Sequence, residues 1–258
     1  MCAPPCPRPD PTIATSTQPA RCQLVPVEST GIQAIRIGSL RTGTIRSAAS
    51  ATTGRAPKWW RCCPLCALPL QTSAPACGEC LQRQPPFAAA FAPFLYAHPL
   101  DLLMTRLKFG RSLAAGRVLS ELWSEAITML APALPTIFVP VPLHPSRLRE
   151  RGYNQAFELL RPLARSLRMP VAESLLARTR ATPAQANLDA SARRQNLRGA
   201  FEFHAPALRG AAPADLHVAL VDDVMTTGAT LRECARVLRR AGIGRVDVWA
   251  LARAPRQR

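Results

Sequence analysis

A run of apolar residues ends in two adjacent aspartates and a short loop rich in hydroxyl groups. The apolar run is Val218–Val221, the acids are Asp222 and Asp223, and the loop Met225–Thr230 leads into a helical pattern. Two adjacent carboxylates can accept hydrogen bonds from the hydroxyls of a ribose and can bind Mg2+, which prefers oxygen ligands. Backbone N–H groups and threonine hydroxyls can surround a phosphate where the next helix begins. The segment therefore predicts a site for a sugar phosphate.

The loop differs from other phosphate loops and from an ordinary turn. Gly228 has no Cβ, so the backbone can approach a phosphate closely there. No Gly-Lys-Ser/Thr sequence occurs, which excludes a Walker loop. The alternative is an aspartate-capped turn before a helix, but twin acids, hydroxyls and a glycine together favour a ligand site. The predicted binding residues are Asp222, Asp223, Met225, Thr226, Thr227, Gly228, Ala229 and Thr230, of which the two aspartates are the candidate catalytic residues.

Four cysteines form a second candidate site. They make two Cys-x-x-Cys pairs with ten residues between them. Four thiolates in tetrahedral geometry suit Zn2+, and a set with no open position is typical of a structural metal. Disulfides, a redox Cys-x-x-Cys motif or an iron–sulfur centre are the alternatives, but paired cysteines within an odd total of nine favour a metal in a reducing compartment. The predicted zinc ligands are Cys63, Cys66, Cys77 and Cys80.

The charge of the chain points to a phosphate-bearing partner. The 258 residues have a net charge of +17, and all but two of the 33 basic residues are arginines. Arginine binds phosphate through its planar fork, although a high arginine content also follows genomic base composition. A metabolite and a nucleic acid both fit this charge. No apolar window is long enough for a membrane span and no secretory signal opens the chain, so we expect a cytoplasmic protein without membrane insertion.

Composition divides the chain into three parts. Residues 1–57 contain eight of the 26 prolines and no aromatic residue, which predicts a disordered extension. Two other interpretations stay open: a start of translation further along the chain, or a basic tail that binds nucleic acid. We expect a zinc-ribbon module at residues 58–92. The third part, residues 93–258, has the pattern of an α/β domain.

The third part alternates between helical and strand patterns. This alternation predicts a mainly parallel, twisted sheet flanked by helices. Pro140 and Pro142 favour an edge or the end of a strand, and Pro162 interrupts a helical stripe. The expected helices span residues 95–130 with a break at 110–112, 153–167 and 230–241; the expected strands span 136–142, 171–176, 217–221 and 246–251; and the expected loops span 143–152 and 178–199.

Several segments resemble the ComF/GntX family of type I phosphoribosyltransferase-like proteins. The resemblance runs in order over roughly residues 60–255 and leaves the first 57 residues outside. It implies a type I phosphoribosyltransferase fold with an N-terminal zinc ribbon, and it implies that 5-phosphoribosyl 1-pyrophosphate (PRPP) binds with Mg2+ at the aspartates. The segments that carry the resemblance are 96–100, 107–109, 139–145, 149–156, 182–185, 193–201 and 218–230.

The resemblance also assigns the two expected loops. Residues 143–152 would form the pyrophosphate loop, where Arg147, Arg149 and Arg151 would meet the pyrophosphate charge, unless they form a solvated basic turn. Residues 178–199 would form a flexible loop that closes over the ribose, with Arg193 and Asn196 as its candidate ligands. Lys108 is near the site in the resemblance, but a surface position is the default expectation for a lysine.

The resemblance implies a role in DNA uptake during natural competence. One hypothesis is an enzyme that transfers phosphoribose from PRPP to an unknown acceptor and releases pyrophosphate. The alternative is a non-enzymatic module that binds single-stranded DNA and uses the PRPP pocket for sensing or docking, together with a competence helicase. Purine salvage is a weaker hypothesis because no base-specificity element is recognisable.

Overall fold

The computed structural model describes residues 62–72, 74–130, 133–181, 196–208 and 210–255. The expected N-terminal extension, 1–57, lies outside the described residues, and so does Arg193. The helices are α1 (Gly78–Gln82), α2 (Leu100–Phe109), α3 (Leu113–Leu130), α4 (Pro145–Arg151), α5 (Gln155–Ser166) and α7 (Ala229–Arg240), with 3-10 turns at Ala205–Leu208 and Pro213–Asp215. The strands are β1 (Ala90–Phe91), β2 (Phe94–Leu95), β3 (Ile137–Pro140), β4 (Leu176–Arg178), β5 (Phe201–Phe203), β6 (His217–Met225) and β7 (Arg245–Arg253).

A parallel sheet forms the centre of the described structure. Its strand order is β1-β7-β6-β3, and β2 also pairs with β7. Pro140 ends β3 and lies opposite Val221 of β6. Strands β4 and β5 form a separate antiparallel sheet. The expected mainly parallel α/β architecture is therefore confirmed.

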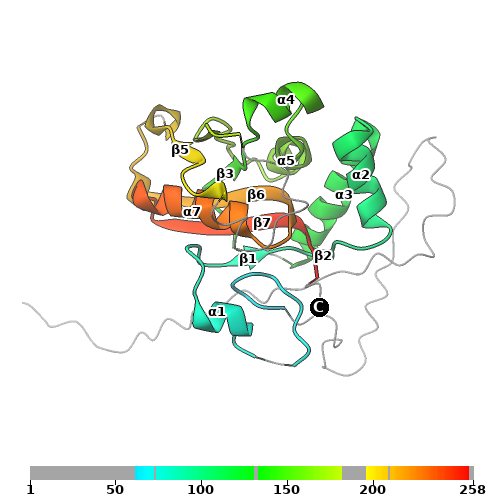
Figure 1. Ribbon diagram of the computed structural model, residues 1–258, viewed down its shortest axis with the longest axis horizontal. Coiled ribbons are helices and arrows are strands. Elements are labelled where there is room, and N and C mark those ends of the chain that lie inside the picture. The colour runs from blue at the N-terminus through cyan, green and yellow to red at the C-terminus, as the bar shows by residue number, and fades with distance from the viewer. Residues whose placement is uncertain (1–61, 73, 131–132, 182–195, 209, 256–258) are drawn as a thin grey trace, which may run out of the picture.

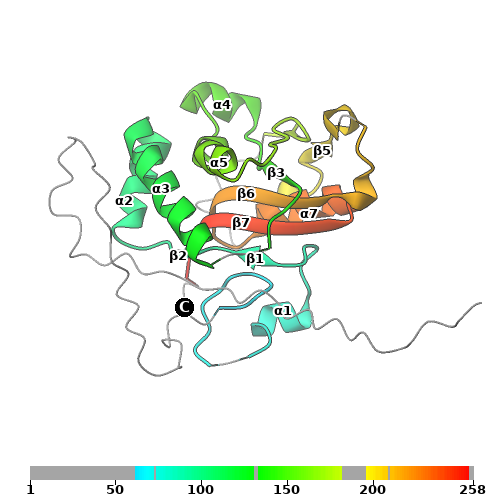
Figure 2. The ribbon, with the colours of Figure 1, turned by 180° about the vertical axis from the view of Figure 1, so that it is seen from behind.

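The two faces of the sheet carry two separate apolar cores. Residues of β6 alternate between them: Val218 and Leu220 face one core, whereas Ala219 and Val221 face the other. The first core includes the buried stripe of α7 and the four-cysteine segment. The second includes the buried residues of α2, α3 and α5. Figures 1 and 2 show α7 on one side of the sheet and these three helices on the other.

The helix boundaries follow capping chemistry. Ser112 Oγ accepts from Ala115 N at 3.3 Å, so the helical stretch 95–130 divides into α2 and α3 near the expected break. Asn154 Oδ1 accepts from Ala156 N at 3.0 Å and caps α5. Pro162 lies inside α5, whose buried face docks the helix on the sheet, so packing retains the helix despite the missing donor.

Three expectations about elements were wrong. Part of the expected loop 143–152 is the helix α4, because Pro145 suits the first turn and His144 Nδ1 accepts from Ser146 N at 3.2 Å. The expected strand 171–176 is reduced to a bridge at Val171, and β4 begins only at Leu176. The strand expected at 217–221 continues to Met225, because β7 pairs with it as far as that residue.

The zinc-ribbon segment contacts the same sheet. Ala90 and Phe91, inside the expected module 58–92, pair with β7 as β1. The division into domains at residue 92 stays a prediction. In the part of the chain that the structure describes, every helix is too short or too polar to cross a membrane.

Candidate functional site

A pocket of about 550 Å³ opens at the carboxyl ends of β3 and β6. Open parallel sheets bind ligands at this edge, because loops and helix N-termini converge there. Asp222 and Asp223 reach the pocket from β6, and Thr226 and Thr230 reach it from the loop and from α7. The pocket therefore combines paired carboxylates with hydroxyl donors at the start of a helix.

The two carboxylates occupy different electrostatic environments. Lys108 Nζ lies 2.8 Å from Asp223 Oδ2, and both side chains are largely buried. Burial opposes the charge of Lys108, but the adjacent Asp223 carboxylate raises its pKa. Burial raises the pKa of Asp222 to about 7, and the charge of Asp223 adds to this while Lys108 opposes it. Asp222 can therefore change its charge near neutral pH.

The loop after β6 has a backbone conformation that needs glycine. Gly228 has a φ of +71°, and a Cβ there would lie 2.7 Å from Met225 Cε. Met225 is itself buried below the loop. Thr227 and Ala229 line a neighbouring pocket of about 160 Å³ between α1 and α7. Of the predicted loop residues, Thr226 and Thr230 therefore line the larger pocket, Thr227 and Ala229 the smaller one, and Met225 and Gly228 neither.

The three arginines of the expected pyrophosphate loop differ in whether they line the pocket. Arg147 and Arg151 line the larger pocket from α4, whereas Arg149 is exposed and does not line it. Arg147 Nη1 lies 2.9 Å from Glu150 Oε2. The guanidinium of Arg151 stacks 5.7 Å from the ring centre of Phe109. Two cationic side chains therefore line the same pocket as the acid pair.

The expected flexible loop contributes a different residue from those predicted. Asn196 does not line the pocket; its carbonyl accepts from Arg180 Nη2 at 2.6 Å. Arg193 lies outside the described residues. Arg178, at the end of β4, does line the pocket, and its guanidinium lies 5.5 Å from the ring centre of Phe201. Burial lowers the pKa of Arg178, and the charge of Asp222 opposes this effect.

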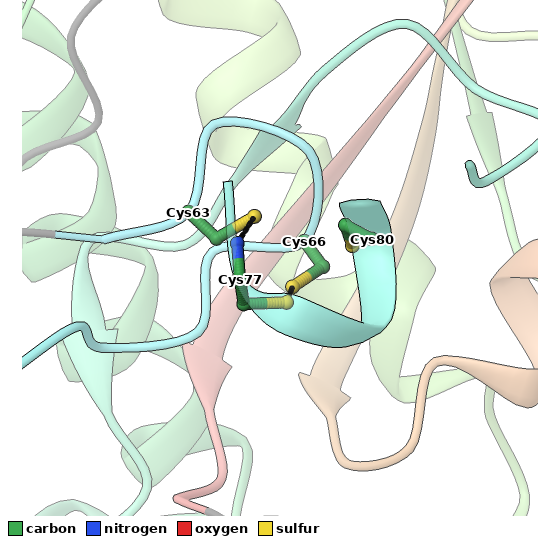
Figure 3. A group of neighbouring side chains, drawn as sticks. All are labelled: Cys63, Cys66, Cys77 and Cys80. Carbon is green, nitrogen blue, oxygen red and sulfur yellow. Dashed lines mark hydrogen bonds between the residues drawn. The ribbon is translucent and has the colours of Figure 1, made fainter. Parts of the chain in front are cut away.

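The four predicted cysteine ligands converge in a buried cluster. Their sulfur atoms lie within 4.8 Å of one another (Figure 3). Tetrahedral Zn2+ with Zn–S distances of about 2.3 Å places sulfurs roughly 3.8 Å apart, so the residues fit this metal. Cys77 N donates to Cys63 Sγ at 3.3 Å, and a hydrogen bond of this kind stabilises a thiolate. A hydrogen bond from Cys66 lowers the pKa of Cys63. These four cysteines could hold a metal such as zinc.

Comparison with known proteins decides the family. The chain is 39% identical over 195 residues to DNA utilization protein YhgH of Escherichia coli, covering 74% of this chain and 83% of that protein. It is 38% identical over 196 residues to Competence protein F of Haemophilus influenzae, covering 74% of this chain and 84% of that protein. The chain belongs to the competence protein F family. No family model matches it.

Family membership confirms the resemblance seen in the sequence segments. Three residues of this competence protein F family member line the pocket although the sequence did not predict them as ligands: Lys108, Phe109 and Arg178. Lys108 and Phe109 lie in a segment that carried the resemblance, which was a usable signal. Arg178 begins the expected flexible loop 178–199 but was not singled out there, because its place in the pocket depends on the pairing of β4 with β5 across a long connection.

Proposed function

We propose that this member of the competence protein F family binds PRPP with Mg2+ in the pocket at the carboxyl ends of β3 and β6. One observation carries the proposal: a single pocket of about 550 Å³ is lined by an acid pair, loop hydroxyls and arginines. Each group matches a different part of PRPP. The ribose diol matches the carboxylates, the 5-phosphate matches the hydroxyls, and the pyrophosphate matches the arginines.

The roles of the residues follow from their positions. Asp222 and Asp223 accept hydrogen bonds from the ribose hydroxyls or hold Mg2+ through oxygen. Thr226 and Thr230 donate to the 5-phosphate beside the N-terminus of α7. Lys108 compensates the charge of Asp223. Asp222 is therefore the acid of the pair whose charge changes near neutral pH.

The same arrangement supports transfer of the phosphoribosyl group. The bond between ribose C1 and the pyrophosphate oxygen breaks, and its electron pair leaves with pyrophosphate. Arg147 and Arg151 stabilise the charge that develops on that group. Mg2+ supplies further charge neutralisation when bound. A nucleophile on the acceptor then bonds to C1 and loses its proton, which Asp222, with its pKa raised to about 7, can accept.

We extend the proposal to the use of DNA. The relatives are named DNA utilization protein and Competence protein F. We infer that this chain takes part in DNA uptake during natural competence, in the cytoplasm, where a competence helicase would deliver single strands. The acceptor of phosphoribose would then be a product or partner of DNA processing.

The second candidate is a binding module without turnover. It is favoured by the high arginine content and by Phe109, whose side chain is 73% exposed at the pocket and stacks with Arg151. Aromatic rings and guanidinium groups together bind the bases and phosphates of single strands. In this case PRPP would regulate binding to DNA instead of reacting.

One measurement tests what the two candidates share, and two further assays separate them. Isothermal titration of PRPP with Mg2+, with ribose 5-phosphate as the comparison ligand, tests the pocket that both candidates need. Pyrophosphate release in the presence of single-stranded DNA, nucleosides and nucleobases supports the enzyme. Single-strand binding that weakens with salt and responds to PRPP, without pyrophosphate release, supports the module. Absence of PRPP binding would contradict both.

A further inference from the structure

Arg253 is a buried arginine that touches both candidate sites. It lies at the end of β7 and is 6% exposed. Its Nε donates to the carbonyl of Cys66 at 2.9 Å, inside the four-cysteine cluster. Its Nη1 donates to the carbonyl of Met225 at 2.8 Å and also to the carbonyl of Thr226. One guanidinium therefore spans from a metal-ligand residue to the loop after β6.

These hydrogen bonds set the direction of two peptide units. The Met225–Thr226 and Thr226–Thr227 peptides are trans, so the N–H of each points away from its carbonyl. Because both carbonyls point toward Arg253, the amides of Thr226 and Thr227 point away from it. Among the described residues, neither amide donates to a protein acceptor. Two successive free amides in one turn form a nest for an anion.

The pocket lies on the side of β6 opposite to Arg253. Arg253 belongs to β7, which pairs with one edge of β6, and β3 pairs with the other edge. The Met225 carbonyl also accepts from Ala254 N at 3.0 Å, which confirms that it faces β7. The amide of Thr226 is consequently directed toward the β3 side, where Thr226 lines the pocket with Arg147.

We propose that Arg253 is a positioning residue that holds the phosphate-loop amides in their anion-binding direction and makes that direction depend on the metal state of the cysteine cluster. The inference deepens the proposed function and relies on it for the identity of the anion. A metal would fix the backbone at Cys66, and the fixed carbonyl would anchor the guanidinium. Without the metal, Arg253 would lose one anchor and the loop would lose its orientation.

The test is a cycle of two perturbations on the full chain: Arg253→Lys and removal of the metal. A lysine keeps the charge, but its single nitrogen cannot contact Cys66 and the loop with the geometry of the guanidinium fork. Arg245→Lys is the matched control, because it changes an arginine on the same strand at the end that pairs with His217, away from the pocket. The metal content of each variant is measured first, and Arg253→Lys is expected to retain the wild-type content.

Affinity for PRPP with Mg2+ is the first readout. We expect Arg253→Lys and metal removal each to weaken binding by roughly tenfold, as expected for the loss of a hydrogen bond to a charged group. Applied together, they should weaken binding little more than either alone, since both break the same connection. Wild-type affinity in Arg253→Lys, or multiplication of the two effects, would overturn the inference.

Amide hydrogen exchange without ligand is the second readout, followed at Ala254, whose N–H donates to the Met225 carbonyl, and at Ala229, whose N–H donates to Thr227 Oγ1 at 3.4 Å. Faster exchange in Arg253→Lys and in the metal-free wild type, with no further increase when both are combined, supports the inference. Unchanged exchange in either case overturns it. This readout separates the two claims: a wild type that fails to bind PRPP would refute the proposed function, while the exchange cycle would still decide whether Arg253 couples the cluster to the loop.

Discussion

Lys108 of α2 and Asp223 of β6 form an ion pair with a separation of 2.8 Å in the largely buried wall of the candidate site. The pair attaches the helical layer to the strand that carries both aspartates. It also neutralises one of two adjacent carboxylates, which would otherwise repel each other. The default expectation that Lys108 is a surface residue was therefore wrong.

Replacing Lys108 with methionine should destabilise the protein. The substitution leaves the Asp223 carboxylate without its ammonium partner in a largely buried position. We expect the free energy of unfolding to fall by about 2 kcal/mol, measured by urea denaturation. The control is Arg106→Met on the exposed face of the same helix, with an expected change below about 0.5 kcal/mol. Equal effects of the two substitutions would contradict the role of the pair.

The Asp222 carboxyl should titrate near pH 7 instead of near its usual value of 3.8. Carboxyl carbon NMR on isotopically labelled aspartate follows it, with Asp222→Asn to assign the signal. Asp223→Asn should lower the midpoint because a negative neighbour is removed, and Lys108→Met should raise it because a positive neighbour is removed. A midpoint near 4 in the wild type would refute this account of the acid pair.

The fold and the chemical groups were predictable where the signal is local. The strand Val218–Val221, the acids after it and the cysteine pairs lie within short segments whose residue types specify their chemistry. Helix α4 was missed because its start depends on capping by His144, which competes with the loop signal of an arginine-rich segment. Short elements with few apolar residues give no periodicity to detect.

The partners of the site could not be read in the same way. Lys108, Arg178 and Arg253 become part of it only through tertiary contacts between distant segments. Sequence patterns identified the pocket residues that follow strands, such as Asp222 and Thr226, but not those brought in by distant segments. In the sequence, Arg253 follows the apolar residues of an expected strand. Only the structure shows that its guanidinium donates to backbone carbonyls.

Gly228→Ala should disturb the phosphate loop in two ways: the new side chain strains the left-handed backbone, and it also collides with a neighbour. The added Cβ would lie 2.7 Å from Met225 Cε. Gly210→Ala is the matched control, since Gly210 has a φ of +89° with no atom within 4 Å of the new Cβ and lies outside both loops assigned to the pocket. Both variants should lose roughly 1–2 kcal/mol of stability through the backbone. Only Gly228→Ala should weaken PRPP binding, by an expected tenfold or more in calorimetric titrations.

The cysteine cluster should hold one metal ion per chain. Cys77→Ser is expected to abolish stoichiometric zinc, measured by elemental analysis, and to lower the melting temperature, because a structural metal contributes folding energy. The control Cys234→Ala changes a cysteine that is also buried but lies on α7 outside the cluster. It should retain the metal. A purified wild type that contains no metal and gains no stability from added zinc would contradict a metal site.

The most direct test of the central claim is isothermal titration of PRPP with Mg2+ into the wild type and into the double variant Asp222→Asn, Asp223→Asn. The two amides preserve the size of the side chains but remove the charges that bind Mg2+ and replace one acceptor oxygen of each carboxylate with an NH2 donor. We predict saturable binding with one site per chain in the wild type, and loss of that binding in a folded double variant. A wild type that does not bind PRPP, or a double variant that binds it equally well, would contradict the assignment of this pocket.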